Sequence, residues 1–274
     1  MQKRIFILCT KHDENLLSLY QEAYYLGYSV IPCYLSTEYE KILAQLFSIV
    51  TVNDFVIILH TNFGSNYCHN IIKNIKCKRL LNSKAFELEN IGQKLFQQTV
   101  VALKDPSISI PTYTKNNIHN NISLPCISKP NDASCGQGVK LALSLEDVEK
   151  STDGTIFQRF IKNDGDWRVV VIGGKAVSAI KRLGRIGKVT NNLATGSFAV
   201  TEHDPIILSS IYRVAEIAAD ALGFDYVGID VIKDLENNQY YFLESNERPT
   251  FETSQILTGT NIAKKIIEEL VRES

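Results

Sequence analysis

Lys129 closes a predicted β-strand and is followed by small residues, among them Ser134, Gly136 and Gly138. Small residues let the backbone approach an anion closely, and a lysine just before them can reach phosphate oxygens. The segment is not a P-loop, because no Gly-Lys-Ser/Thr sequence follows and no helix is predicted to begin there. The alternative interpretation is a flexible hairpin loop with a solvent-exposed lysine.

Two later predicted strands carry carboxylates. Asp230 lies in the apolar run GIDVIK, and Glu244 and Asn246 lie in FLESNERP. Their side chains form an oxygen-only ligand set of the kind that suits Mg²⁺. Buried carboxylates without a cation are costly, which favours a metal-binding function. The alternative is an ion pair with Arg182 or Arg248.

A cluster of cations follows another predicted strand, in the segment IKRLGRIGKVTNNL. Cations close to an anion site could hold a phosphate or a carboxylate substrate, as guanidinium groups do well. A charged surface loop is the alternative interpretation. The polar residues concerned are Lys181, Arg182, Arg185, Lys188 and Asn192.

Arg168 stands alone among apolar residues in the predicted strand GDWRVVVIGG. Asp166 lies two positions earlier and therefore on the same face of that strand. The pattern is compatible with a site residue and equally with an internal ion pair between Arg168 and Asp166.

The elements that must position these residues fall into two parts. Up to about residue 80, short apolar runs alternate with helical patterns, which predicts parallel strands in a small α/β domain. No Gly-x-Gly-x-x-Gly follows the first strand, so a dinucleotide-binding turn is missing. A helix is predicted at 84–103 and stops at Asp105-Pro106, and strands dominate after residue 110. A cleft beside the strand-rich subdomain near residues 109–157 is the expected ligand site.

The same pattern predicts the later elements. Gly173-Gly174 indicates a tight hairpin, and a long helix is expected at 205–222. Two strands joined by a polar turn follow, and a terminal helix comes after Gly259.

Composition is that of an ordinary globular protein of 274 residues, with 45% hydrophobic and 22% charged residues. Lysine plus arginine is 29 against 30 acidic residues, so no broad field favours nucleic acid or an anionic membrane. Apolar runs are far shorter than the roughly 20 residues of a membrane span. The apolar stretch near the start is too short for the hydrophobic region of a secretory signal and runs straight into charged residues. We therefore expect a cytoplasmic protein. The six cysteines form no C-x-x-C pair, which favours reduced thiols, Cys135 included.

Taken together and in this order, the motifs resemble the ATP-grasp superfamily, and within it the RimK-like ATP-dependent carboxylate-amine ligases. That branch includes ribosomal protein glutamate ligases and amino-group-carrier ligases. QKLFQQTVVALKDPSISIPTY places Lys94 at the family's first phosphate lysine, and ISKPNDASCGQGV places Lys129 at its second. IFQRFI corresponds to the adenine-binding hinge and GDWRVVVIGGKAVSAIKR to the arginine-bearing hairpin. VGIDVI and FLESNERPTFETSQILTGTNIAKKII correspond to the metal motifs and the closing helix.

The resemblance implies a fold of combined α/β and α+β class. A pre-ATP-grasp α/β domain is expected at 1–83 and an ATP-grasp domain at 84–274. The second would contain a central lid subdomain at about 109–157 and a C-terminal antiparallel-sheet domain.

The resemblance also implies an ATP- and Mg²⁺-dependent ligase, with Mn²⁺ as an alternative metal. It would form an amide or peptide bond through an acyl phosphate. The partners would be carboxylate and amine substrates that are amino acids or peptides, with neither nucleic acid nor membrane, and a homo-oligomer stays open. The implied roles are nucleotide binding by Lys94, Lys129, Ser134, Gly136, Gly138, Gln158, Arg159, Phe160, Ile161 and Asp166, metal binding by Asp230, Glu244 and Asn246, and catalysis by Arg168, Arg182 and Asn192.

Three places depart from the family pattern. Arg159 stands where the hinge usually has an acidic residue, and Glu247 and Arg248 replace small residues after the metal motif. Transfer of the glutamate-adding activity is therefore unsafe, although the reaction class is kept. The third departure replaces arginine, histidine and glycine of the glutamate ligase pattern by Thr190, Ala194, Thr195 and Ser197.

Alternative functions are a non-catalytic ATP-binding regulator or partner subunit and a peptide-crosslinking, graspetide-type ligase. A nucleic-acid-binding module has only scattered basic residues in its favour.

Overall fold

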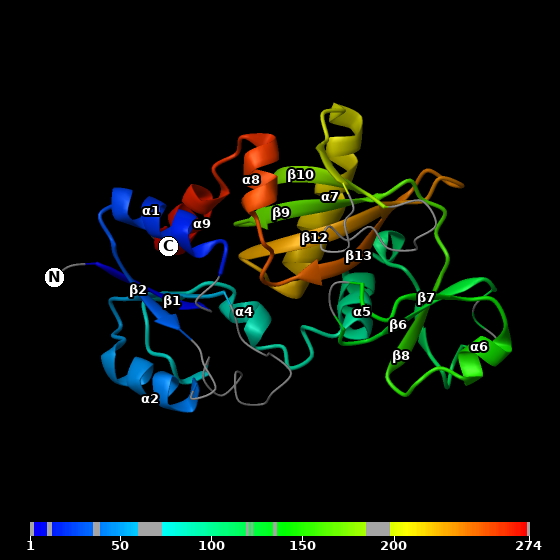
Figure 1. The fold of residues 1–274 in the computed structure, drawn as a ribbon, viewed down its shortest axis with the longest axis horizontal. Helices are drawn as coiled ribbons and strands as arrows, with labels where there is room; N and C mark the ends of the chain where they lie inside the picture. Colours follow the sequence, from blue (N-terminus) through cyan, green and yellow to red (C-terminus); the bar gives the residue numbers. More distant parts are fainter. Residues whose placement is uncertain are drawn as a thin grey trace.

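The computed structural model describes residues 3–9, 13–34, 39–59, 73–118, 121, 123–133, 136–184 and 198–272. Strands of these residues form an N-terminal sheet, a central sheet and a lid sheet (Figure 1). The N-terminal sheet is parallel and has the order β2 (Ser29–Tyr34), β1 (Arg4–Cys9), β3 (Phe55–Ile58), β4 (Arg79–Leu80).

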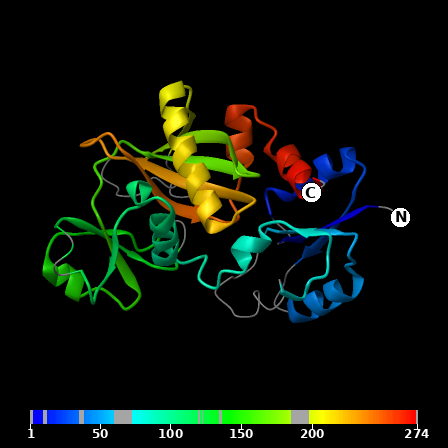
Figure 2. The same ribbon diagram turned by 180° about the vertical axis from the view of Figure 1, so that it is seen from behind.

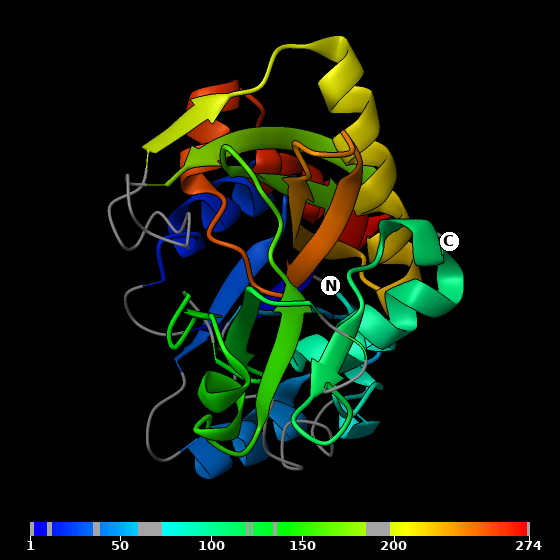
Figure 3. The ribbon, with the colours of Figure 1, turned by 90° about the vertical axis from the view of Figure 1, so that its right-hand side faces the viewer.

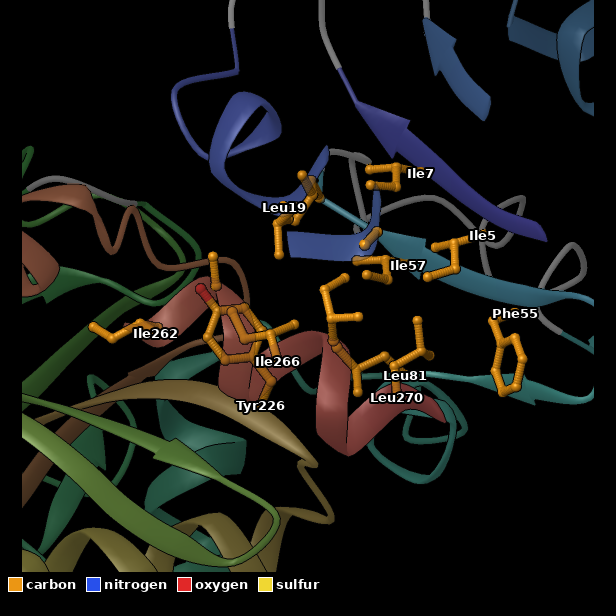
Figure 4. Packing of buried hydrophobic residues seen from close by; sticks show 14 of the residues in the cluster. Ile5, Ile7, Leu19, Phe55, Ile57, Leu81, Tyr226, Ile262, Ile266 and Leu270 are labelled. Carbon is orange, nitrogen blue, oxygen red and sulfur yellow. The ribbon is translucent and has the colours of Figure 1, made fainter. Parts of the chain in front are cut away.

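Helices cover both faces of the N-terminal sheet. The buried β1 residues Phe6 and Leu8 pack with residues of α2 (Tyr39–Ile49). Their neighbours Ile5 and Ile7 point to the other face, toward α1 (Leu16–Tyr25) and the C-terminal α9 (Ile262–Val271). Figure 4 shows this second cluster. The terminal helix thus belongs to the packing of the first domain, and the predicted boundary at residue 83 stays a prediction.

The central sheet is antiparallel, with the order β11 (Phe198–Thr201), β10 (Lys175–Leu183), β9 (Asp166–Ile172), β12 (Tyr226–Lys233), β13 (Tyr240–Asn246). Alternate residues such as Val169, Ile229 and Val231 are buried with α7 (Pro205–Leu222), which crosses the back of the sheet (Figure 2). Because side chains alternate along a strand, the residues between them point to the opposite face. That face carries the polar residues singled out from the sequence.

The lid sheet is also antiparallel and lies beside the central sheet in the side view (Figure 3). Its order is β5 (Thr112–Thr114), β8 (Thr155–Arg159), β6 (Cys126–Pro130), β7 (Lys140–Ala142). A small core around Phe157 and Val148 joins it to α6 (Leu145–Glu149). Ser144 and Asp147 cap that helix reciprocally, which ends the turn after β7.

The predicted single helix at 84–103 is wrong. The chain forms α4 (Ser83–Phe86) and then α5 (Lys94–Lys104), followed by the 3₁₀ turn η1 (Pro106–Ile108). Asn131 of the lid causes the restart, because its carbonyl accepts from the backbone N–H of Lys94 and its side chain accepts from that of Leu95. First-turn N–H groups need such partners. Helix α8 (Glu252–Thr258) was not expected from the sequence.

One parallel and two antiparallel sheets in the described part confirm the predicted α/β and α+β class. Helix α7 occupies the predicted range, starting at Pro205 after the Asp204 cap and ending before Gly223, which has a positive φ of 73°. No helix in the described ranges is both long and apolar enough to cross a membrane.

Candidate active site

A cleft of about 710 Å³ is lined by residues from both the lid sheet and the central sheet. Gly138 is not part of the lining, and Ser134, Cys135 and Asn192 lie outside the described residues. The cleft brings together the other predicted site residues, namely Lys94, Lys129, Gly136, Gln158, Arg159, Phe160, Ile161, Asp166, Arg168, Arg182, Asp230, Glu244 and Asn246.

Strand register places the charged residues of the central sheet in one row. Asp230 on β12 pairs with Arg168 on one side and with Glu244 on the other. Directly opposed residues in antiparallel strands point to the same face and lie close together. Asn246 is two positions beyond Glu244 and shares this face. The register therefore places Asp230 beside the Glu-x-Asn motif.

Asp230 is the centre of an ion-pair network. Arg168 pairs with it through Nε and also donates from Nη2 at 3.2 Å. Arg182 Nη2 lies 2.9 Å from Asp230 Oδ2, while its Nε contacts Asp166 Oδ1 at 2.6 Å. The Asn246 amide nitrogen donates to Asp230 Oδ2 at 3.4 Å. The sequence-based alternative of an Asp230–Arg182 pair is thus present, but with a second arginine that it did not include.

The network keeps Asp230 and Arg182 in their charged forms. Burial raises the pKa of the Asp230 carboxyl, but Arg168 and Arg182 outweigh this and hold the pKa below its usual range. Burial lowers the pKa of Arg182, whereas Asp230 and Asp166 raise it above its ordinary value. A buried carboxylate flanked by two guanidinium groups is the arrangement in which each charge supports the others.

Two buried lysines face this network. Lys129, on lid strand β6, is 5% exposed, and Lys94, at the start of α5, is 9% exposed. Burial lowers the pKa of Lys129 to about 8, although the negative charge of Glu244 acts in the opposite direction. Lys94 Nζ lies 3.8 Å from Glu244 Oε2 and donates to the carbonyl of Ala133 in the glycine-rich loop. Positive charge is therefore concentrated opposite Glu244.

Side-chain amides fix α5, and with it Lys94, against the sheet. Gln97 accepts from the backbone N–H of Ser245 at 2.9 Å. Gln98 donates to the carbonyl of Phe242 at 2.9 Å and accepts from the N–H of Ile110 at 2.9 Å. Both glutamines are buried. The sequence shows them only as two consecutive polar residues on an amphipathic helix, so their role in holding α5 could not be predicted from it.

The glycine-rich loop joins β6 to β7 and uses backbone conformations that suit glycine. Gly136 and Gly138 have positive φ values of 70° and 72°. A Cβ atom on Gly138 would lie 2.8 Å from Cγ of Pro130. Gly138 thus shapes the loop from outside the cleft, and Gly136 lines it.

One end of the cleft is apolar. Ile110, Ile161 and Ile232 form a buried cluster with Tyr241, and Leu243 packs against it. The hinge residues 158–161 border this end. Gln158 is 3% exposed and donates to the Thr112 hydroxyl at 2.7 Å, so its side chain is used inside the lid.

The opposite end of the cleft contains residues that the sequence analysis did not assign. Glu14 reaches it from the N-terminal domain, and Thr253 and Ser254 reach it from α8. Glu247 and Arg248, noted from the sequence as departures, line the same end. Only tertiary structure brings Glu14 to this end, because more than 200 residues separate it from α8.

Comparison with known proteins gives one family and several relatives. The model of the RimK-like ATP-grasp domain matches residues 83–270. A probable alpha-L-glutamate ligase of Parasynechococcus marenigrum is 33% identical over 174 residues, which are 60% of this chain and 36% of the relative. The chain therefore covers only about a third of that protein's length.

Two solved structures share the fold. L-amino acid ligase from Bacillus licheniformis has a TM-score of 0.71 at 16% identity, covering 98% of this chain and 74% of that one. The ATP-grasp ligase PsnB in complex with a minimal precursor has a TM-score of 0.69 at 15% identity, covering 99% of each chain. Because the family model spans well over half of the 274 residues, the chain belongs to the RimK-like ATP-grasp family.

Proposed function

We propose that the protein is an ATP-dependent carboxylate-amine ligase that acts on an amino acid or peptide and forms an amide bond through an acyl phosphate. One observation supports this above the others. Two buried lysines on one side of the cleft face Glu244 and the Arg168–Asp230–Arg182 network on the other. Such a site can hold a polyphosphate and stabilise charge on a transferred phosphoryl group.

In this proposal the two ends of the cleft bind different parts of the nucleotide. The base lies in the apolar end, among Ile110, Ile161 and Ile232, with its edge against the hinge backbone. The phosphates extend toward Lys94 and Lys129, and the loop containing Gly136 covers them and excludes water. Backbone recognition at the hinge tolerates Arg159 in place of an acidic residue.

The residues present fit a magnesium ion. Asp230 and Glu244 lie side by side on neighbouring strands, and Asn246 uses its amide nitrogen toward Asp230, which leaves its oxygen as a ligand. Both oxygens of Asp230 accept from Arg168 and Arg182, so Glu244 and Asn246 offer the free oxygens and Asp230 would have to exchange an arginine contact to bind the ion. The described residues contain no group of three or more His, Cys, Asp or Glu side chains that could hold a metal, so phosphate and water oxygens would complete the shell. When bound, Mg²⁺ would neutralise charge on the β- and γ-phosphates.

The chemistry then needs no protein nucleophile. A substrate carboxylate oxygen forms a bond to the γ-phosphorus as the bond to ADP breaks. The amine of the second substrate attacks the acyl carbon and loses a proton, and inorganic phosphate leaves. Arg168 and Arg182 line the cleft beside Asp230 and would stabilise the negative charge of the transferred group. Asn192 keeps its predicted catalytic role as an expectation only.

ADP release over a panel of amino acids and short peptides, with product masses measured, tests the proposal. Glu244→Ala should abolish ADP release while Mg²⁺ and ATP are present. Glu236→Ala is the matched control, because Glu236 is an exposed carboxylate at the tip of the same hairpin. If Glu244→Ala turns over like the wild type, the metal assignment is wrong.

A peptide-crosslinking ligase is the second candidate, since PsnB, an ATP-grasp ligase solved in complex with a minimal precursor, shares the fold over 99% of each chain. Product masses separate the two. Joining of two substrates gives a product of their summed mass less one water, whereas an internal crosslink removes water from a single peptide. ATP binding without ADP formation across the whole panel would instead support a non-catalytic regulator.

A further inference from the structure

Arg159 is the last residue of lid strand β8, and its side chain leaves the lid. Its Nη1 lies 2.7 Å from Oδ2 of Asp234, the residue that follows β12 of the central sheet. The guanidinium carbon lies 4.8 Å from the centroid of the Tyr241 ring on β13. Both contacts join the lid sheet to the hairpin tip of the central sheet, across the hinge.

Asp234 is held firmly for this contact. Its side chain is 3% exposed, and its Oδ1 accepts from the backbone N–H of Glu236 at 3.0 Å. Its backbone N–H donates to the carbonyl of Gln239 at 2.9 Å. Burial raises the pKa of this carboxyl, but the hydrogen bonds from Arg159 and from the Glu236 backbone, together with the charge of Arg159, keep the pKa below its ordinary value. The carboxylate is thus a rigid, charged anchor.

Tyr241 connects the same contact to the cleft. It belongs to the buried cluster with Ile110, Ile161 and Ile232 that forms the apolar end. Its hydroxyl donates to Gln239 Oε1 at 2.6 Å and accepts from the Asn237 amide at 3.0 Å, so the ring is fixed from the hairpin tip. Arg159 therefore stacks on a ring whose cluster supports the proposed base site.

We propose that Arg159 is a positioning residue for nucleotide binding: through Asp234 and Tyr241 it sets where the hinge backbone at 158–161 lies relative to the apolar end of the cleft. The inference rests on the proposed function, because it assumes that this backbone binds the base. It explains why an arginine works where the family pattern has an acidic residue. The side chain orients the strand that presents the base-binding groups.

Leu235 gives the hinge a second tie to the hairpin tip, since its N–H donates to the carbonyl of Lys162 at 2.9 Å. Loss of Arg159 should therefore loosen the end of β8 without detaching the lid. The effect is expected on contacts made by the base and not on contacts made by the phosphates, which lie at the lysine end.

Calorimetry of Arg159→Met with Mg-ATP and with Mg-tripolyphosphate tests this separation. We expect the Kd for Mg-ATP to rise about tenfold, an effect typical of mutations at positioning residues. The Kd for tripolyphosphate should stay at the wild-type value. The double variant Arg159→Met with Asp234→Asn should bind Mg-ATP no more weakly than Arg159→Met alone, because both substitutions remove the same Arg159–Asp234 contact. Unchanged ATP affinity, equal losses for both ligands, or additive effects would overturn the inference.

Arg213→Met is the matched control, because Arg213 forms a 2.8 Å pair with Asp105 on the exposed surface. Hydrogen exchange of residues 155–161 in the nucleotide-free protein gives a readout that does not depend on the proposed function. Arg159→Met and Asp234→Asn should speed exchange there and leave β1 unchanged. If the wild type binds no ATP, the proposed function fails, and exchange alone decides whether Arg159 positions the strand. Exchange like that of the wild type would then refute the positioning role.

Discussion

Arg182 on β10 and Asp230 on β12 form an ion pair of 2.9 Å although their strands are not neighbours, because β9 runs between them. Arg168 on β9 lies opposite Asp230 and pairs with the same carboxylate. The carboxylate is thus held from two strands at once. This arrangement fixes Asp230 beside Glu244, which is the preorganisation that the proposed phosphoryl transfer requires.

Asp230→Asn should destabilise the fold because it leaves the buried Arg182 and the half-buried Arg168 without their common partner. We expect the free energy of unfolding to fall by about 3 kcal/mol, as for other broken buried ion pairs. Denaturant unfolding measures this. Glu244→Gln is the control, since that side chain is 26% exposed and contacts Lys94 only at 3.8 Å. Equal losses in the two variants would show that the network does not stabilise the sheet.

The lowered pKa of Lys129 predicts how the Kd for ATP depends on pH. Burial lowers the pKa of Lys129 to about 8, so the free protein loses this positive charge as pH rises through 8. The charged form binds phosphate, so the Kd for ATP should increase above pH 8 by up to about tenfold per pH unit. Titration calorimetry from about pH 6.5 to about pH 9.5, roughly 1.5 units on either side of this pKa, would show the change in Kd. Lys129→Met should bind more weakly at pH 7 and lose this pH dependence. A flat wild-type profile would contradict the assignment.

Gly138→Ala should distort the glycine-rich loop. The position has a positive φ of 72°, and a Cβ would meet the Pro130 ring at 2.8 Å. Strain of this kind costs roughly 1–2 kcal/mol, enough to weaken ATP binding about tenfold if the loop closes on the phosphates. Gly92→Ala is the control, because nothing lies within 4 Å of a Cβ there. Equal ATP affinity in both variants would exclude a role for loop shape.

Local signals predicted most of the fold. The Asp204 cap, Pro205 and Gly223 define α7, and short runs of β-branched residues define β9 and β12, because these elements depend on residues close by in the sequence. The predicted helix at 84–103 is wrong for two reasons. Asn90 and Gly92 lie in the turns that interrupt it, and Asn131, far along the chain, supplies the partners that start α5 at Lys94. Propensity alone carries no information about such a distant cap.

The candidate site divides in the same way. Asp230 and Glu244 could be placed together because a single hairpin joins their strands. The sequence offers Arg182 as one of two arginine partners of Asp230, but it does not offer the second partner, Arg168, since that contact depends on β9 lying directly beside β12. The Arg159–Asp234 contact could not be predicted either, because it depends on how the lid meets the hairpin tip.

The contacts of Asn15 lead to a prediction about how the N-terminal domain supports the cleft. Its buried amide donates to the carbonyl of Pro249 at 3.2 Å and accepts from the N–H of Phe251 at 3.1 Å. It thereby holds the segment 247–254, whose residues line the end of the cleft away from the hinge. Asn15→Ala leaves the Phe251 N–H buried without this partner, and we expect unfolding to become easier by about 2 kcal/mol.

The functional consequence should be selective. Because the nucleotide is proposed to lie toward the hinge, Asn15→Ala should leave the Kd for ATP unchanged and raise the KM for the carboxylate or amine substrate. Ser18→Ala is the control, since it removes a contact of 2.5 Å with Glu252 between the same two segments without touching residues 249–251. Weaker ATP binding in Asn15→Ala with an unchanged substrate KM would mean that this segment serves the nucleotide, and that the N-terminal domain does not shape the substrate end of the cleft.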